Sequence, residues 1–434
     1  MGLAMVRGLL YAALIPPWQA PDEPGHFEQA WLIARLGRIP TAQDADPELE
    51  RALVASLYEW RYGDYLGRPL PPRMPDRLAD LPPEIFAGHS RTLGRFSPAY
   101  LWLALWILPV QGEDLLVGLY LARCASVALN AMILVAAWRL FRLLIPEQPT
   151  LARAMALFLA LHPQHTFINA AVGEGPLAEL GATLALYGWA HLLIRGWTAR
   201  GLAWALGGTV LGVVAKGTAL YLIPLAPVAL TLALVRGFRR YWERALLGAV
   251  LGLAALGLVG WWLPHMPGAP LLNHLFDTWR SGELKVEGNS SKSFDQILVA
   301  GIESYWFNLG WMNVPAPKGW YLVFWIAMLW SVEGWLLPRS PGPRTSSAAL
   351  ALIVVAAGLA VGGWIAFLVT PRGTWYYQGR YLFPAAAALT FLLIGGWARA
   401  LPKTAQARFP AFLVAAMVAM EAIAFFPVVL SKFY

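Results

Sequence analysis

Long apolar segments constrain this chain more than any other feature. Many of them run for roughly 17–25 residues, the length that crosses the hydrocarbon core of a bilayer. Only 13% of the residues are charged, and the mean hydropathy is +0.53. This composition excludes a soluble multi-domain protein. Because a spanning segment must satisfy its own backbone hydrogen bonds, we expect an all-α polytopic membrane protein.

The apolar segments predict a single transmembrane domain over residues 1–434 with about 11 spans. The predicted spans are 2–15, 115–138, 154–171, 176–194, 201–215, 218–235, 245–263, 318–338, 347–369, 380–398 and 409–430. The first lacks the cleavage pattern of a signal peptide, so we expect a retained helix. Residues 16–113 form a large first loop with short juxtamembrane helices, and 264–317 form a second large loop. The apolar segment 97–108 is too short to cross, so we expect it to be interfacial or re-entrant.

The distribution of charge predicts the orientation. With these spans, five alternate loops hold 14 basic and two acidic residues, whereas the 16–113 loop holds 13 acidic and 9 basic ones. By the positive-inside rule, the N-terminus is cytoplasmic and the 16–113 loop is extracytoplasmic, in the inner (plasma) membrane of a cell. The net charge of +8 is thereby explained as a topology signal, and we expect no nucleic-acid partner.

Two adjacent carboxylates follow the first apolar segment, in the stretch Pro21-Asp22-Glu23-Pro24-Gly25-His26. Unpaired charge at the edge of a membrane is costly, so its presence there needs a reason. A carboxylate can deprotonate an attacking hydroxyl group, which makes Asp22 a candidate catalytic base and Glu23 its candidate partner. The structural alternative is that Asp22 caps a helix over 22–36. Asp22, Glu23 and His26 are also the candidate ligands for a divalent metal, although their spacing matches no established metal motif.

Two isolated cations fall on the same predicted face. Lys216 lies in the short turn between two spans, and Arg380 lies between Gln378 and Tyr381 at the start of another. A lysine offers a point charge to a phosphate, and an arginine can clamp one with two parallel hydrogen bonds. The alternatives are that Lys216 only snorkels to the interface and that Arg380 only anchors its helix there. Further substrate contacts are predicted from five residues on this face: His26, His165, Glu174, Gln378 and Tyr381.

The sequence carries no glycine-rich nucleotide loop and no Walker lysine motif, so an ATP-driven mechanism is disfavoured. A transferred group must then arrive already activated, and a lipid carrier meets that need on the outer face of a membrane.

The order of these motifs resembles that of the polytopic GT-C glycosyltransferases, such as protein O-mannosyltransferases and the lipid A aminoarabinose transferase. A bacterial membrane family catalogued as a domain of unknown function, and grouped with the GT-C enzymes, is similar more narrowly. The motifs that carry this second resemblance are Pro21-Asp22-Glu23-Pro24-x-His26-Phe27, Lys216, Phe307-x-Leu309-Gly310-Trp311 and Gln378-Gly379-Arg380-Tyr381-x-x-Pro384. The chain departs from the GT-C pattern at Phe96-Ser97-Pro98-Ala99-Tyr100 and from the narrower family at Gly173-Glu174-Gly175.

The resemblance implies a GT-C-like bundle and transfer of a sugar from a polyprenyl-phosphate donor, with inversion and without a nucleotide. It implies that Asp22 is the base, that Glu23 is its neighbour, and that Lys216 and Arg380 hold the lipid phosphate. The expected partners are this donor, membrane lipid, and an extracytoplasmic glycan, lipid or protein acceptor.

Two other functions stay open at this point. A transporter or flippase of lipid-linked sugars would carry polar residues on both faces and inverted repeats. A non-catalytic membrane subunit would dock a partner through the 16–113 loop. The distances between Asp22, Lys216 and Arg380 distinguish these functions from an enzyme. The glycosyltransferase hypothesis needs all three side chains in one cavity.

Overall fold

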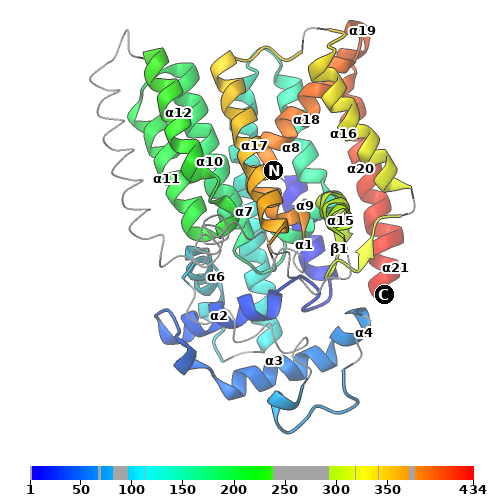
Figure 1. The fold of residues 1–434 in the computed structure, drawn as a ribbon. Helices are drawn as coiled ribbons and strands as arrows, with labels where there is room; N and C mark the ends of the chain where they lie inside the picture. The colour runs from blue at the N-terminus through cyan, green and yellow to red at the C-terminus, as the bar shows by residue number, and fades with distance from the viewer. Residues whose placement is uncertain are drawn as a thin grey trace.

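The computed structural model of the chain describes residues 2–66, 70–81, 96–112, 114–237, 293–317, 319–340, 342–370 and 377–434. Long helices lie side by side in one bundle, and shorter helices cross its lower end in Figure 1. The bundle helices are α1 (Gly2–Leu14), α7 (Leu115–Leu144), α8 (Pro149–Leu161), α10 (Gly175–Arg195), α11 (Ala199–Ala215), α12 (Leu222–Gly237), α16 (Trp320–Leu336), α17 (Ser347–Leu368), α18 (Ala386–Ala400) and α20 (Phe409–Ile423).

The remaining elements are short. The short α-helices are α2 (Glu23–Leu36), α3 (Pro47–Glu59), α4 (Tyr62–Leu66), α6 (Pro98–Ile107), α9 (Pro163–Asn169), α15 (Phe294–Trp306), α19 (Lys403–Gln406) and α21 (Ser431–Phe433). The 3-10 turns are η1 (Ala42–Asp44), η2 (Leu78–Asp80), η4 (Leu108–Val110), η5 (Gly217–Ala219) and η7 (Gly379–Ala385), and the π-helical turn is η8 (Ala424–Leu430). Strands β1 (Asn308–Leu309) and β2 (Val314–Pro315) pair antiparallel, with Asn308 opposite Pro315.

Six helices in the described parts of the chain are long and apolar enough to cross a membrane: Leu115–Leu144, Gly175–Arg195, Gly217–Val235, Ser347–Leu368, Gly379–Ala400 and Phe409–Phe433. Each corresponds to a predicted span. Three further predicted spans correspond to shorter apolar helices: Gly2–Leu14, Ala199–Ala215 and Trp320–Leu336. The predicted span 154–171 overlaps a fourth, Pro149–Leu161, only in part. The predicted span 245–263 lies outside the described residues. The structure therefore confirms a helical membrane architecture but not the count of 11.

The predicted span 154–171 is wrong as a single helix. Helix α8 ends at Leu161, and Pro163 starts α9 after the non-helical His162. A proline inside a helix lacks the N–H donor and clashes with the preceding turn, but it is well tolerated at the first helical position. After the break, α9 packs against α1, α7 and α15. The segment 97–108 forms the ten-residue α6, capped by Ser97, which is shorter than a span as predicted.

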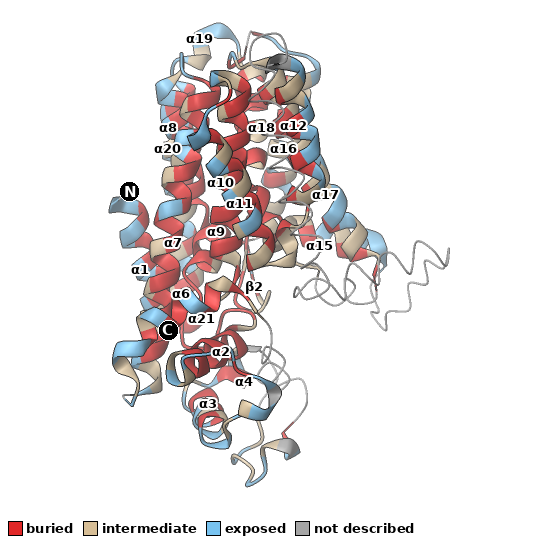
Figure 2. Cartoon of the chain, turned by 90° about the vertical axis from the view of Figure 1, so that its left-hand side faces the viewer, coloured by how far each residue is buried: buried red, intermediate tan, exposed pale blue. Residues whose placement is uncertain are grey.

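The bundle packs closely where small residues face each other. A Cβ added to Gly181 of α10 would lie 2.3 Å from the backbone nitrogen of Gly212 in α11, so only glycine allows these helices to approach so closely. Buried residues continue down the bundle axis into α2 in Figure 2. Every residue of α2 from Glu23 to Ile33 is buried, because α6, α7 and α3 pack around it.

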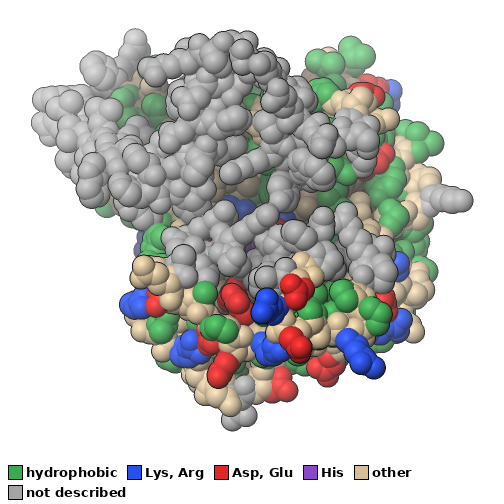
Figure 3. Space-filling model, turned by 60° about the horizontal axis from the view of Figure 1, so that its bottom comes forward, with side chains coloured by type: hydrophobic (Ala, Val, Ile, Leu, Met, Phe, Trp, Pro, Cys, Tyr) green, Lys and Arg blue, Asp and Glu red, His purple; other side chains and the backbone are tan. Residues whose placement is uncertain are grey.

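The lower end of the molecule is polar on its outside. Exposed ion pairs join Arg38 to Asp44 and Arg61 to Asp64 there. Figure 3 shows acidic and basic side chains interspersed over this face. The first loop thus covers the bundle end with a buried helix, α2, and a charged outer layer.

Candidate functional site

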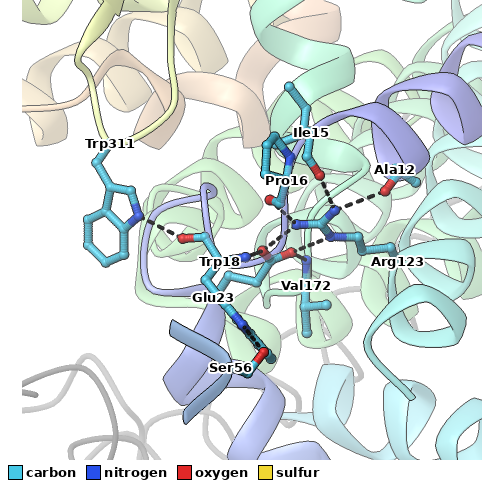
Figure 4. A network of polar contacts seen from close by, with 9 residues as sticks. All are labelled: Ala12, Ile15, Pro16, Trp18, Glu23, Ser56, Arg123, Val172 and Trp311. Atoms are coloured by element: carbon cyan, nitrogen blue, oxygen red, sulfur yellow. Dashed lines mark hydrogen bonds and ion pairs between the residues drawn. The ribbon is translucent and has the colours of Figure 1, made fainter. Parts of the chain in front are cut away.

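The turn that joins α1 to α2 has an unusual backbone. Trp18 and Asp22 both have positive φ, 70° and 65°, which is unfavourable for residues other than glycine. Such a conformation persists only where the surroundings impose it. The Trp18 indole donates to Ser56 of α3 (2.9 Å), and the Trp18 carbonyl accepts from the Trp311 indole (3.0 Å). Distant elements therefore hold this turn in shape (Figure 4).

A buried ion pair forms the centre of the same network. Arg123 of α7 donates to both carboxylate oxygens of Glu23, at 2.8 and 2.6 Å, and both side chains are at most 1% exposed. The guanidinium also donates to the carbonyls at the end of α1 and in the turn: Ala12, Ile15 and Pro16. The Glu23 oxygens accept further hydrogen bonds from the backbone of Trp18 and Val172. The ion pair thereby ties α1, α2, α7 and the α9–α10 loop together (Figure 4).

This geometry corrects the prediction for Glu23. Its carboxylate is fully buried, and its oxygens are occupied by Arg123 and by backbone N–H groups. A carboxylate bound in this way is not available to a substrate. Glu23 is a positioning residue that holds the turn before Asp22 in place.

Asp22 points to a different partner. It occupies the N-cap position of α2, but its side chain makes no capping hydrogen bond. Instead, Arg380 Nη2 donates to Asp22 Oδ2 at 2.6 Å, and Arg380 Nη1 donates to the Pro21 carbonyl at 3.3 Å. Burial alone would raise the pKa of the Asp22 carboxyl, but the charges of Arg380, His26 and Lys216 hold it below its ordinary value. Asp22 is therefore ionised at neutral pH.

Lys216 and Arg380 both lie near the aromatic ring of Tyr381. The Lys216 ammonium is 5.9 Å and the Arg380 guanidinium 5.5 Å from the centre of that ring. The turn that carries Lys216 is fixed by Ser97, whose hydroxyl donates to the Ala215 carbonyl at 2.8 Å. No carboxylate among the described residues lies within ion-pair distance of Lys216. Lys216 thus borders the cavity without a carboxylate ion-pair partner in the described ranges.

These residues surround a single cavity. It holds about 500 Å³ of empty space when its open side is included. Its lining combines Pro21, His26, Lys216, Thr218, Arg380, Phe383 and Pro384 with the segment 168–176. Asp22 is not in contact with the empty space itself but is bound to Arg380, which is. A concave site with a few convergent polar groups is the usual form of a small-molecule site.

His26 enters the cavity from α2. Its Nδ1 is 2.8 Å from the hydroxyl of Tyr100 in α6, so the ring has a fixed orientation. Both residues are at most 9% exposed. Helix α6 therefore fixes two parts of the site, His26 through Tyr100 and the Lys216 turn through Ser97.

The end of α9 and the start of α10 form another part of the lining. Asn169 and Glu174 both border the cavity. Glu179 and His165 lie behind Asn169. Asn169 Nδ2 donates to Glu179 Oε2 at 3.0 Å, and His165 Nε2 lies 2.7 Å from Glu179 Oε1. His165, Asn169 and Glu179 are each 1% exposed. This polar cluster is buried against the cavity wall.

The other predicted site residues separate into two groups. Tyr381 lies near both cations, Gln378 directly precedes η7, and His165 lies behind Asn169. None of these three residues lines the cavity. The predicted metal ligands do not assemble, because Glu23 faces Arg123 and not His26. Within the described ranges, no group of three His, Cys, Asp or Glu side chains is placed to hold a metal ion.

Sequence reasoning missed Glu179 as a neighbour of the site. It is a carboxylate inside the predicted span 176–194, and an ionisable residue within a span indicates a functional site. That signal was present in the sequence. The contact of Glu179 with His165 and Asn169, by contrast, depends on the break between α8 and α9.

The fold and the site define a polytopic helical membrane protein with a polar cavity near one end of its bundle. The chain belongs to the family described as "Predicted membrane protein (DUF2142)", whose model matches residues 5–389. This match confirms the coarser part of the resemblance, membership of a membrane-protein family catalogued as a domain of unknown function. The comparison with curated proteins gave no match, and neither did the comparison with solved structures.

Proposed function

We propose that this protein is a GT-C-type membrane glycosyltransferase that moves a sugar from a polyprenyl-phosphate donor to an extracytoplasmic acceptor. The acceptor is a cell-envelope glycan, lipid or protein, and the reaction takes place at the outer face of the inner membrane. One observation carries the proposal: an ionised carboxylate, Asp22, is held beside two cations, Arg380 and Lys216, at one cavity.

The proposed chemistry uses each of these groups once. A hydroxyl group of the acceptor attacks the anomeric carbon, the bond from that carbon to the phosphate oxygen breaks, and the sugar inverts its configuration. The acceptor proton passes to Asp22, which acts as general base. Lys216 and Arg380 bind the phosphate and stabilise the negative charge that it gains on leaving.

Arg380 has capacity left for this task. Its side chain is 9% exposed, and its Nε is buried without a hydrogen-bond partner among the described residues. An unpaired buried donor costs free energy, so a ligand that accepts from it is favoured. A phosphate bound to Arg380 also competes for the guanidinium that holds Asp22. Donor binding would then release Asp22 and raise the pKa of its carboxyl, which makes it a stronger base when the substrate is present.

The same closeness supports the enzyme over a non-catalytic subunit. That alternative does not require Asp22 to pair with Arg380 at a cavity that Lys216 also lines, although the three residues come from distant segments of the chain. The transfer reaction requires them together, with a base and a phosphate site within one substrate length.

The test is transfer by the purified full-length chain in lipid nanodiscs, with a panel of polyprenyl-phosphate sugars and release of polyprenyl phosphate as readout. Asp22→Asn should lower the release rate by about 10²–10⁴-fold, because it removes the general base. Asp64→Asn is the matched control, since Asp64 pairs with Arg61 on the exposed surface and should leave the rate unchanged. Full activity of Asp22→Asn would refute the proposal.

A further inference from the structure

The cavity wall formed by the end of α9 and the start of α10 is chemically different from the wall with the cations. It carries Asn169 and Glu174, with Glu179 directly behind Asn169. These side chains present amide and carboxylate oxygens, which accept hydrogen bonds. A phosphate offers only acceptors, so this wall does not suit it. The wall suits a ligand that donates hydrogen bonds.

The orientation of the Asn169 amide follows from its neighbours. Its nitrogen lies 3.0 Å from Glu179 Oε2, and a carboxylate oxygen next to an amide requires the NH₂ end to face it. The other Glu179 oxygen is engaged by His165 at 2.7 Å. Glu179 and His165 therefore lock the amide, and its oxygen must face elsewhere.

That oxygen is the unsatisfied hydrogen-bond acceptor of the cluster. Asn169 is 1% exposed and lines the cavity, and its Oδ1 has no hydrogen-bond partner in the part of the chain that the structure describes. Buried amide oxygens are almost always hydrogen-bonded. A hydroxyl group that enters the cavity would supply the missing donor.

We propose that the α9–α10 wall is a sugar subsite, in which Asn169 Oδ1 accepts a hydrogen bond from a hydroxyl group of the donor's neutral sugar. The subsite rests on the proposed function, because it assumes that the ligand of Lys216 and Arg380 is a sugar-bearing phosphate. Asn169 binds the sugar while Lys216 and Arg380 bind the phosphate. Glu179 and His165 position the Asn169 amide.

The experiment distinguishes the sugar subsite from the phosphate site by using one lipid with a sugar and one without. Binding of polyprenyl phosphate and of polyprenyl-phosphate hexose is measured on the full-length chain in nanodiscs, for the wild type and for Asn169→Ala. We expect the wild type to bind the hexose-bearing lipid more tightly than polyprenyl phosphate alone. Asn169→Ala should bind the hexose-bearing lipid about tenfold more weakly than the wild type does, the equivalent of one buried hydrogen bond. Binding of polyprenyl phosphate alone should change less than about twofold, because Asn169 does not contact the phosphate.

Thr166→Ala is the matched control. Thr166 lies in the same helix, α9, is equally buried and does not line the cavity. It should bind both lipids as the wild type does. A set of monodeoxy hexose lipids provides a second measurement that does not depend on the variant's stability. One hydroxyl deletion should weaken binding to the wild type and not to Asn169→Ala.

Three results would overturn the subsite: an undiminished preference for the hexose in Asn169→Ala, an equal loss of affinity for both lipids, or no preference in the wild type. Failure of the proposed function is recognised separately. In that case Lys216→Gln would leave the affinity for polyprenyl phosphate unchanged, whatever Asn169→Ala does.

Discussion

Arg380 and Asp22 are 358 residues apart in the sequence, yet a guanidinium nitrogen of one lies 2.6 Å from a carboxylate oxygen of the other. Arg380 also contacts the Pro21 carbonyl, so it binds both the side chain and the backbone of the turn before α2. The ion pair therefore places the candidate base relative to the candidate phosphate site.

Replacing Arg380 with lysine should weaken binding of polyprenyl phosphate by about tenfold, because a lysine offers a point charge where a guanidinium binds a phosphate with two parallel hydrogen bonds. Arg380→Gln should bind more weakly still. The measurement is the dissociation constant in nanodiscs. Arg61→Lys, at an exposed ion pair, is the control and should not change it. If Arg380→Lys bound polyprenyl phosphate as tightly as the wild type does, the phosphate would not depend on the parallel donors of the guanidinium.

Breaking the Glu23–Arg123 ion pair should destabilise the protein strongly. Arg123→Met leaves a fully buried carboxylate without its partner, which costs about 3–5 kcal/mol. The midpoint of thermal unfolding in detergent should fall accordingly. The double variant Glu23→Gln/Arg123→Met should recover part of the loss, because no charge remains unpaired. Equal midpoints for the single and double variants would contradict this explanation.

Glu28 predicts a pH dependence of stability. It is fully buried in α2, neither of its oxygens has a partner among the described residues, and burial together with Glu50 and Asp46 raises its pKa from 4.5 to about 8. Between these values the folded protein binds a proton that the unfolded chain releases. The free energy of unfolding therefore falls as pH rises from 4.5 to about 8.

Glu28→Gln removes this proton and should make the thermal midpoint less dependent on pH across that window. The variant should gain stability over the wild type most clearly at the alkaline end. Thermal unfolding at several pH values provides the measurement. An unchanged slope in the variant would show that Glu28 does not contribute.

Gly379 should not tolerate a side chain. An added Cβ would lie 2.3 Å from the backbone nitrogen of Tyr305 and 2.5 Å from the carbonyl oxygen of Gly301, both in α15. Gly379→Ala should therefore push η7 away from α15 and displace Arg380, with loss of lipid binding and a lower thermal midpoint. Gly363→Ala in α17 is the matched control, because nothing lies within 4 Å of its added Cβ. Similar behaviour of the two variants would contradict the close approach.

The helical membrane class could be predicted from local sequence, but helix breaks and side-chain partners could not. Apolar length alone identified the six long helices, since a bilayer needs that length whatever the rest of the chain does. The break at His162 was missed, because the apolar residues before His162 and after Thr166 were joined into one predicted span across a short polar stretch. The roles of Asp22 and Glu23 could not be separated, because adjacent residues of one type carry the same local signal.

The sequence by itself determined that the chain is a bundle of apolar helices with rare charges near Asp22, Lys216 and Arg380. Burial of charge is so costly in a membrane protein that rare charges stand out against the apolar background. Only the tertiary structure decided which charges meet. Glu23 turned to Arg123, whereas Asp22 turned to Arg380. The left-handed turn at Trp18 and Asp22, imposed by contacts from α3, α7 and the β1–β2 turn, sets this difference, and no local pattern encodes it.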